Sequence, residues 1–294
     1  MKFLFGGKGG VGKTTTAAAA ALYFSGLART LIVSTDPAHS LSDIFEMRIG
    51  GTETEIRKNL FALEIDPESA IKSYKEKIVQ QFGGTLQEFH LNLESYLESI
   101  EHNPGAYESA IFDEFAKHLL RNDFETIVFD TAPTGSTLRL IFMPEYLNSW
   151  IKFLIQSRKG ILKLREMLTR EKDPVIETLY EMKDQFEKIG HLLTSTETEI
   201  VLVLNPETLA FEETSRTFRL LDHYHVPVKG LVVNRVVDDR FPYAGYLKSQ
   251  KRILEALQNK YEPIPQVQIP FLGDEVKGLN RLANLVPFIQ RLFN

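Results

Sequence analysis

Seven short runs of mostly apolar residues, each bounded by turn-forming residues, indicate buried β-strands. They are Lys2–Phe5, Thr30–Ser34, Phe61–Ile65, Thr126–Thr131, Glu199–Leu204, Gly230–Asn234 and Gln266–Ile269. Helical spacing of apolar residues separates several of them, at Lys13–Ser25, Phe211–Tyr224, Lys248–Asn259 and Leu279–Phe293. Most of the strands are apolar on both faces, which is typical of a parallel sheet covered on both sides. The pattern therefore predicts an α/β fold with a mainly parallel sheet flanked by helices.

Residues 67–122 and 138–193 interrupt this alternation, because each is much longer than a connection between strands needs. Both carry helical stripes of apolar residues with charged residues between them. We expect them to be helical insertions that together form an inserted helical subdomain. Because no internal repeat and no linker rich in Pro, Gly or Ser is evident, residues 1–294 are predicted to form a single domain.

The amino-acid composition of the chain excludes several classes of function. The 294 residues include 34 Lys and Arg against 39 Asp and Glu, a net charge of −5, and no long basic block, so we expect no nucleic-acid partner. The chain has no cysteine, which excludes disulfides, thiolate metal sites and a cysteine nucleophile and fits a cytoplasmic protein. The apolar stretches fall short of the roughly 20 residues that span a bilayer, so no integral membrane segment is predicted.

A glycine-rich loop joins the first predicted strand to the first predicted helix. Its residues fit the phosphate-loop pattern G-x-x-x-x-G-K-[ST]: Gly7, Lys8, Gly9, Gly10, Val11, Gly12, Lys13 and Thr14. The glycines let backbone N–H groups point at phosphates, and the helix start adds the positive end of its dipole. Lys13 is predicted to reach the β- and γ-phosphates of ATP, Thr14 to bind Mg²⁺, and Thr15 to contact a phosphate oxygen. The fold is therefore predicted to be that of a P-loop NTPase.

Two further strands end in a carboxylate at the sheet edge where ligands of α/β proteins bind. Asp36 follows the second strand and can accept a proton from the attacking water, contact Mg²⁺ through water, or only cap the next helix. Asp130 ends a later strand and is predicted as a carboxylate near Mg²⁺, with local capping as the alternative. Pro133 and Gly135 then form a loop that could change path when the γ-phosphate is lost.

Taken together, these motifs closely resemble the ArsA-type ATPases, a family that includes the arsenite-pump ATPase and the factor that targets tail-anchored membrane proteins. The three main segments of resemblance are 7–15, 34–43 and 130–139. Shorter segments extend it almost end to end, at 206–209, 213–214, 232–234, 269–271 and 278–279.

The resemblance implies roles that the residues alone do not assign. Lys8 would reach across a dimer to the partner's nucleotide, as an arginine finger does in trans, whereas a solvated lysine is the alternative. Asp36 would position the attacking water. Asn234 would recognise the adenine base of the nucleotide, and Pro270 and Phe271 would lie near that base. The pump enzyme joins two such halves in one chain, but a single phosphate loop occurs here, so a homodimer is implied.

The sequence also departs from the family pattern. The targeting members usually carry a Cys-x-x-Cys zinc clamp at the base of the dimer, and arsenite pumps sense arsenite through thiolates, neither of which this chain can supply. Ser40 and Ser136 stand where family members often have Asn and His. Dimerisation must therefore rest on other contacts, and the family name alone does not fix the function.

We accordingly predict a homodimeric enzyme that uses ATP and Mg²⁺ to handle a hydrophobic client, such as a transmembrane helix, or a membrane partner. The apolar stripes at 86–100 and 150–168 either line a groove for that client or pack as core. The alternative is an ATPase subunit that couples energy to anion efflux. A nucleotide-dependent scaffold on DNA or membrane is disfavoured, because the apolar tail at 288–294 is a poor anchor.

Overall fold

The computed structural model describes residues 1–36, 40–88, 104–132, 134–169 and 174–294, without the side chains of 81–88, 104, 134, 136, 159–169 and 174. These residues form two compact units. The first consists of Met1–Asp66, Arg121–Leu138 and Leu193–Asn294, and the second of Pro67–Leu120 and Arg139–Leu192. The second unit draws its residues from the two segments in which insertions were predicted.

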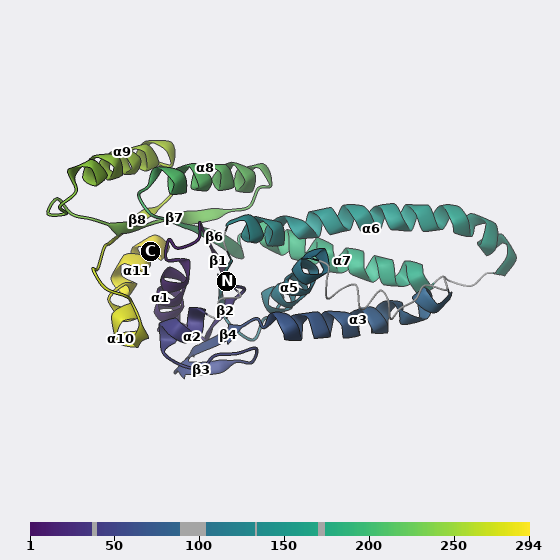
Figure 1. Cartoon of the computed structure of the whole chain (residues 1–294). Helices are drawn as coiled ribbons and strands as arrows, with labels where there is room; N and C mark the ends of the chain where they lie inside the picture. The colour runs from purple at the N-terminus through teal and green to yellow at the C-terminus, as the bar shows by residue number, and fades with distance from the viewer. Residues whose placement is uncertain (37–39, 89–103, 133, 170–173) are drawn as a thin grey trace. The chain divides into compact units, whose positions relative to one another are not determined.

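The first unit is built on an eight-stranded sheet with the strand order β3-β4-β2-β5-β1-β6-β7-β8 (Figure 1). Neighbouring strands are parallel, except that β3 and β4 are antiparallel. The strands are β1 (Lys2–Gly6), β2 (Thr30–Ser34), β3 (Thr54–Arg57), β4 (Leu60–Glu64), β5 (Thr126–Asp130), β6 (Thr198–Leu204), β7 (Val228–Val236) and β8 (Gln266–Pro270). The predicted α/β fold is thus confirmed.

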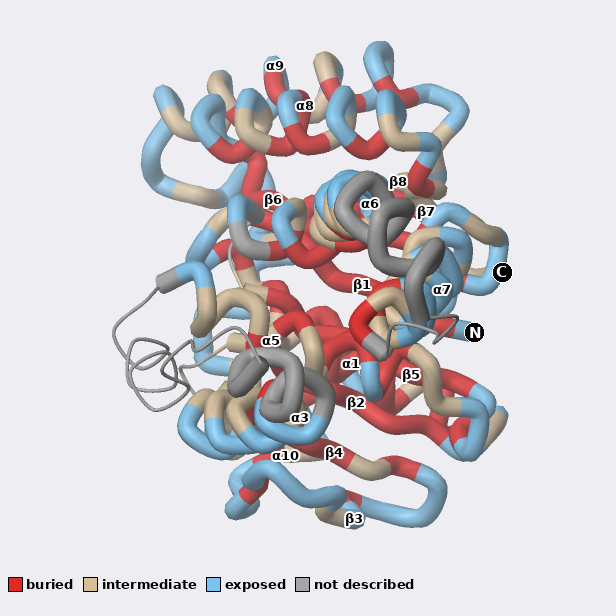
Figure 2. The backbone as a smooth tube through the Cα atoms, turned by 90° about the vertical axis from the view of Figure 1, so that its right-hand side faces the viewer, coloured by how far each residue is buried: buried red, intermediate tan, exposed pale blue. Residues whose placement is uncertain are grey.

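Strand β3 is the strand that the apolar pattern did not predict. It has four residues, of which Ile56 alone is buried, and it lies at the edge of the sheet. An edge strand needs few apolar residues because much of it faces solvent. Central strands β1, β2 and β5 are buried along their whole length, and Figure 2 shows them as the buried middle of the sheet.

Helix α1 (Lys13–Ser25) is enclosed by the rest of the first unit. It packs on β1, β2 and β5, and also on α2 (Ser40–Phe45), α10 (Gly278–Ala283) and α11 (Val286–Phe293). The five alanines at 17–21 are fully buried in these contacts. Their small side chains let the surrounding elements approach the helix closely. This packing fixes the start of α1, where the glycine-rich loop ends.

Helices α8 (Thr208–His223) and α9 (Ala244–Lys260) connect β6, β7 and β8 and pack against each other. From β1 the chain moves to β2, toward one edge of the sheet, whereas from β6 it moves to β7 and then β8, toward the other edge. Because connections between parallel strands are right-handed, α8 and α9 lie on the face of the sheet opposite α1. Figure 1 accordingly shows β7 and β8 between α8 and α9 on one side and α11 on the other.

The prediction of one helix over Leu279–Phe293 is wrong, because α10 and α11 are separate. The intervening Asn284 and Leu285 donate their N–H groups to carbonyls three residues back, which makes a turn tighter than an α-helix. Pro287 then occupies the first turn of α11, where its missing N–H is tolerated. Apolar spacing continues through this break, so the spacing alone did not reveal it.

The second unit is helical. Its described helices are α3 (Pro67–Glu88), α5 (Pro104–Leu119) and most of α6 (Thr134–Thr169) and α7 (Pro174–Thr194). Ile151 and Ile155 of α6 pack with Val175 and Leu179 of α7 in a small core. Across the residues that the structure describes, no helix is both long and apolar enough to cross a membrane.

Gly230 on β7 has no room for a side chain. A Cβ atom there would lie 2.4 Å from Leu292 Cδ1 on α11 and 2.7 Å from the carbonyl oxygen of Pro265. We expect Gly230→Ala to destabilise the protein by about 1–3 kcal/mol and to lower its Tm in thermal unfolding. Gly245→Ala is the matched control, because a Cβ at Gly245 would meet nothing within 4 Å. Equal Tm values for the two variants would contradict this packing.

Candidate functional site

The glycine-rich loop connects β1 to α1 at the carboxyl edge of the parallel strands. Gly10 and Gly12 have φ angles of 80° and 93°, in the left-handed region that favours glycine. Val11 between them is buried and anchors the loop. Gly12 is also the N-cap of α1 and offers no side chain to the first N–H groups of the helix. Those N–H groups are therefore suited to hold an anion such as a phosphate.

Lys13 is a buried cation among carboxylates at the start of α1. Its Nζ lies 3.4 Å from the carbonyl oxygen of Lys8. Burial lowers the pKa of Lys13, while the negative charges of Asp130, Asp36 and Glu213 oppose that shift. The side chain is thus held inside the site, where phosphate oxygens would add favourable charge.

Asp130, at the end of β5, is completely buried and only partly hydrogen-bonded. Its Oδ2 accepts a hydrogen bond from the Ser34 hydroxyl at 3.4 Å, whereas Oδ1 has no hydrogen-bond partner among the described residues. Burial raises the pKa of Asp130 to about 7, although the Thr14 hydroxyl and the charge of Lys13 act in the opposite direction. A buried carboxylate with one oxygen lacking a hydrogen bond is a favourable place for a cation to bind.

The residues around Asp130 fit a Mg²⁺ ion. Thr14 offers a hydroxyl oxygen close to Asp130, and the unpaired Oδ1 offers a carboxylate oxygen. Hard oxygen ligands of this kind are those that Mg²⁺ prefers beside substrate phosphates. When bound, the ion would neutralise charge on the phosphate oxygens of ATP.

Asp36 lies just beyond β2, next to the segment that follows β5. Its N–H donates to Ser34 Oγ at 3.1 Å. Two hydrogen bonds tie the segments together: Thr35 N–H donates to the Asp130 carbonyl oxygen at 2.9 Å, and Ala132 N–H donates to Thr35 Oγ1 at 3.3 Å. The structure therefore brings Asp36 and Asp130 together near Lys13, whereas residues 37–39, Pro133 and the Ser136 side chain lie outside the described residues.

Two buried threonines that sequence reasoning did not select hold the segment after β5 against β1. The Thr131 hydroxyl donates to the Phe5 carbonyl oxygen at 2.7 Å and lies 2.6 Å from Thr137 Oγ1. The Thr137 hydroxyl reaches the Ala132 carbonyl oxygen at 2.8 Å. Phe5 lies one residue before the end of β1, so these contacts link the segment to the strand that leads into the phosphate loop.

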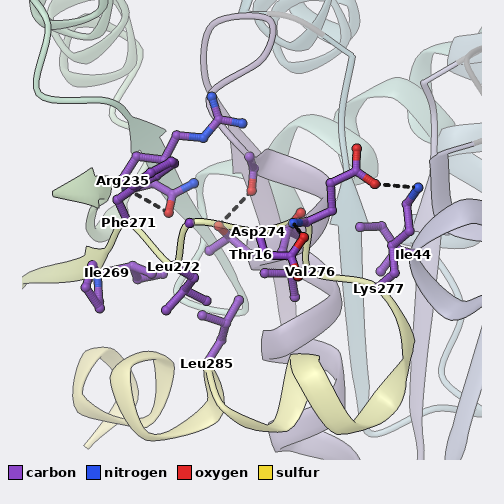
Figure 3. A pocket seen from close by; sticks show the side chains of 16 residues that line it. Thr16, Ile44, Arg235, Ile269, Phe271, Leu272, Asp274, Val276, Lys277 and Leu285 are labelled. Atoms are coloured by element: carbon purple, nitrogen blue, oxygen red, sulfur yellow. Dashed lines mark hydrogen bonds and ion pairs between the residues drawn. The ribbon is translucent and has the colours of Figure 1, made fainter. Parts of the chain in front are cut away.

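A cavity of about 520 Å³ opens beside the phosphate loop (Figure 3). Its lining comes from α1, α2, β7, β8, the segment after β8 and the turn before α11: Gly12, Thr15, Thr16, Ile44, Asn234, Arg235, Ile269–Lys277 and Leu285. A volume of this size is typical of small-molecule sites. Asn234, Pro270 and Phe271 line this cavity together with Gly12 and Thr15, and their role toward adenine stays a prediction. Ile44 and Leu285 could not be predicted as lining residues, because in the sequence they resemble ordinary core residues.

Asn234 contacts the phosphate loop directly. Its Nδ2 donates to the Val11 carbonyl oxygen at 2.8 Å, and its Oδ1 accepts from the Arg235 N–H at 2.9 Å. A Cβ on Gly12 would lie 2.3 Å from Asn234 Nδ2, so only glycine fits there. The amide therefore supports the loop, and its role in reading adenine stays a prediction.

Comparison with known proteins agrees with this geometry. The family model for anion-transporting ATPases matches residues 1–291. The chain belongs to the ArsA family of ATPases. It is 34% identical to a protein named as an arsenical pump-driving ATPase in Aquifex aeolicus (strain VF5), over 98% of each chain. The predicted family is confirmed, and the protein is accordingly an ATPase.

Two eukaryotic members of the family are similar over most of their length. ATPase ASNA1 homolog 1 of Paramecium tetraurelia is 32% identical over 96% of this chain and 90% of that protein. ATPase get3 of Sclerotinia sclerotiorum is 32% identical over 96% of this chain and 87% of that protein. The similarity thus spans both units of the structure.

The incomplete pairing of the Asp130 carboxylate leads to a prediction about stability and activity. Asp130→Asn removes a buried charge, so we expect the nucleotide-free, Mg²⁺-free protein to become more stable by about 1–3 kcal/mol while ATP hydrolysis is lost. Thermal unfolding and a phosphate-release assay measure the two effects. Asp123→Asn is the control, because Asp123 is exposed and paired with Arg121 and its loss should not stabilise. A lower Tm for Asp130→Asn would contradict the interpretation that the buried charge of Asp130 destabilises the nucleotide-free protein.

Proposed function

We propose that this ATPase is a homodimer that hydrolyses Mg²⁺-bound ATP to drive a helical subdomain, which handles a hydrophobic client such as a transmembrane helix. The observation that carries the proposal is a row of three exposed aromatic side chains on α6, Tyr146, Trp150 and Phe153. Use of ATP, which cells hold in the cytoplasm, supports action in that compartment.

Helix α6 has apolar residues on two sides. Ile151 and Ile155 are buried against α7. Tyr146, Trp150 and Phe153 instead expose 75%, 53% and 64% of their surface. Their spacing of four and three residues places them on one side of the helix. Exposed aromatic residues gathered in this way are typical of an interaction site rather than of a packed core.

The exposed row gives the second unit the chemistry of a surface for apolar segments. Buried area and shape, rather than specific hydrogen bonds, recognise a helix laid on such a surface. The resemblance to the targeting branch supports the same role for the insertions. The predicted stripe at 86–100, and the side chains of 159–169 within the second stripe, lie outside the described residues.

The geometry of the first unit supports in-line attack of water on the γ-phosphate. The loop N–H groups and Lys13 stabilise the developing charge, and Thr14 and Asp130 hold the ion-binding position. Asp36 accepts the proton from water or orients it through hydrogen bonding. Lys8, whose carbonyl oxygen faces Lys13, extends its side chain toward the partner protomer's nucleotide.

Mixing two inactive variants tests the dimer and the role of Lys8 in trans. Lys8→Ala and Asp36→Asn should each hydrolyse almost no ATP, although Asp36→Asn still binds it. In a mixed dimer, the site built on the Lys8→Ala protomer keeps its own Asp36 and receives Lys8 from the other protomer. If subunits exchange randomly, the mixture should recover roughly a quarter of the wild-type rate. No recovery, or a monomer in light scattering with a non-hydrolysable ATP analogue, would contradict the proposal.

Client binding is tested by capture of a radiolabelled transmembrane-helix peptide on Asp36→Asn protein held in ATP. We expect ATP-dependent capture that Trp150→Ser with Phe153→Ser reduces about tenfold, because each exposed aromatic would bury its ring on the client. Tyr243→Ser is the control, since Tyr243 is 68% exposed but lies in the first unit. A scrambled polar peptide should not bind. Equal capture by all variants would exclude this side of α6.

Energy coupling to anion efflux is the second candidate, and the similarity to the arsenical pump-driving ATPase favours it. Arsenite normally binds thiolates, which this chain lacks, so its ligand would have to be a harder oxyanion. Stimulation of ATP hydrolysis by an oxyanion such as arsenate, together with no peptide capture, would support this second function over the first.

A further inference from the structure

Glu64 is a buried carboxylate near the ATP site that has no assigned role. It ends β4, its side chain lies beneath the surface, and the residue exposes 1% of its area. In the sheet register, Glu64 lies opposite Ser34 of β2, the residue whose hydroxyl contacts Asp130 and the Asp36 N–H. Burial of a carboxylate is unfavourable unless donors surround it. Leu41 and Ser42, at the beginning of α2, supply such donors.

The carboxylate of Glu64 holds the beginning of α2. Its Oε1 accepts the N–H groups of Leu41 at 2.7 Å and Ser42 at 3.1 Å. Its Oε2 accepts the Ser42 hydroxyl at 3.1 Å. Ser42 Oγ also accepts the Ile49 N–H at 3.1 Å, so the segment after α2 joins the same cluster. Hydrogen bonds to a carboxylate are stronger and shorter than neutral ones, and three of them fix α2 relative to β4.

Helix α2 in turn reaches the phosphate site. Ser40, its first residue, has its Oγ 3.3 Å from Oγ1 of Thr14, the predicted Mg²⁺ ligand. Asp36 lies four residues before Ser40 in the chain. Ser34 thus contacts Asp36, and Glu64 contacts the chain where the described residues resume at α2. Leu41 directly follows Ser40, so a change at Glu64 would act on Ser40 through a single peptide bond.

We propose that Glu64 is a positioning residue for ATP hydrolysis. It fixes the beginning of α2, and thereby the position of Ser40 beside Thr14, where Mg²⁺ is predicted to bind. The donors to its carboxylate belong to Leu41 and Ser42 of α2, so we expect ATP binding to depend on Glu64 less than turnover does. The inference rests on the ATPase activity of the family and is independent of the client proposed above.

Glu64→Gln tests the proposal. The amide keeps one acceptor oxygen but turns an NH₂ group toward the donors of Leu41 or Ser42. We expect kcat for ATP hydrolysis to fall about tenfold or more, with KM and the Kd of a fluorescent ATP analogue changing less than about threefold. Glu55→Gln, at an exposed position on β3, is the matched control and should retain wild-type kinetics.

A second variant separates positioning from folding. Ser42→Ala removes the hydroxyl contacts to Glu64 and to Ile49 but leaves both N–H contacts to Glu64, so kcat of the folded protein should fall by a smaller factor even if Tm falls. Hydrogen exchange at the Leu41 and Ser42 amides should accelerate in Glu64→Gln while exchange in β1 and β5 stays slow. An unchanged kcat in folded Glu64→Gln would overturn the proposal. So would a loss of activity that only follows the unfolded fraction, with Ser42→Ala fully active.

Discussion

Parallel pairing of β5 with both β1 and β2 is the constraint on which the site depends. In this register Asp130 lies level with Phe5 on one side and with Ser34 on the other. The loop after β1 and the segment after β2 therefore start at the same level along the strands, on either side of the Asp130 carboxylate. A shift of one residue would turn Asp130 toward the other face of the sheet and remove the negative charge that acts most strongly on Lys13.

Burial of opposite charges at this sheet edge explains why the site suits a nucleotide. Lys13 and Asp130 are both removed from water, and each shifts the pKa of the other toward its charged form. Their pairing is incomplete, since Oδ1 of Asp130 lacks a partner among the described residues. A phosphate with its cation would satisfy both groups at once. The protein thus stores unfavourable electrostatic energy that binding relieves.

Local sequence patterns predicted what depends on neighbours in the chain. The phosphate loop consists of consecutive residues, so its pattern is visible in the sequence. Asp36 and Asp130 were predicted as site residues because each comes at the end of an apolar strand. Contacts between distant residues were not predictable: Glu64 meets Leu41 across 23 positions and Asn234 meets Val11 across 223. On α6, apolar residues on both sides give the same periodicity whether they are buried, like Ile151, or exposed, like Phe153. Only packing distinguishes them.

Helix α2 has a consequence for how the whole nucleotide would be bound. This helix of six residues contributes Ser40 beside Thr14, which is predicted to bind Mg²⁺, and Ile44 to the wall of the neighbouring cavity. Ligands at both places would contact one short element, so we expect their binding energies to be coupled. Thermodynamic linkage makes that coupling reciprocal: whatever occupancy of the cavity does to affinity at Thr14, occupancy at Thr14 does equally to the cavity. Phosphates and base would then act as one cooperative ligand rather than as two fragments that happen to be joined.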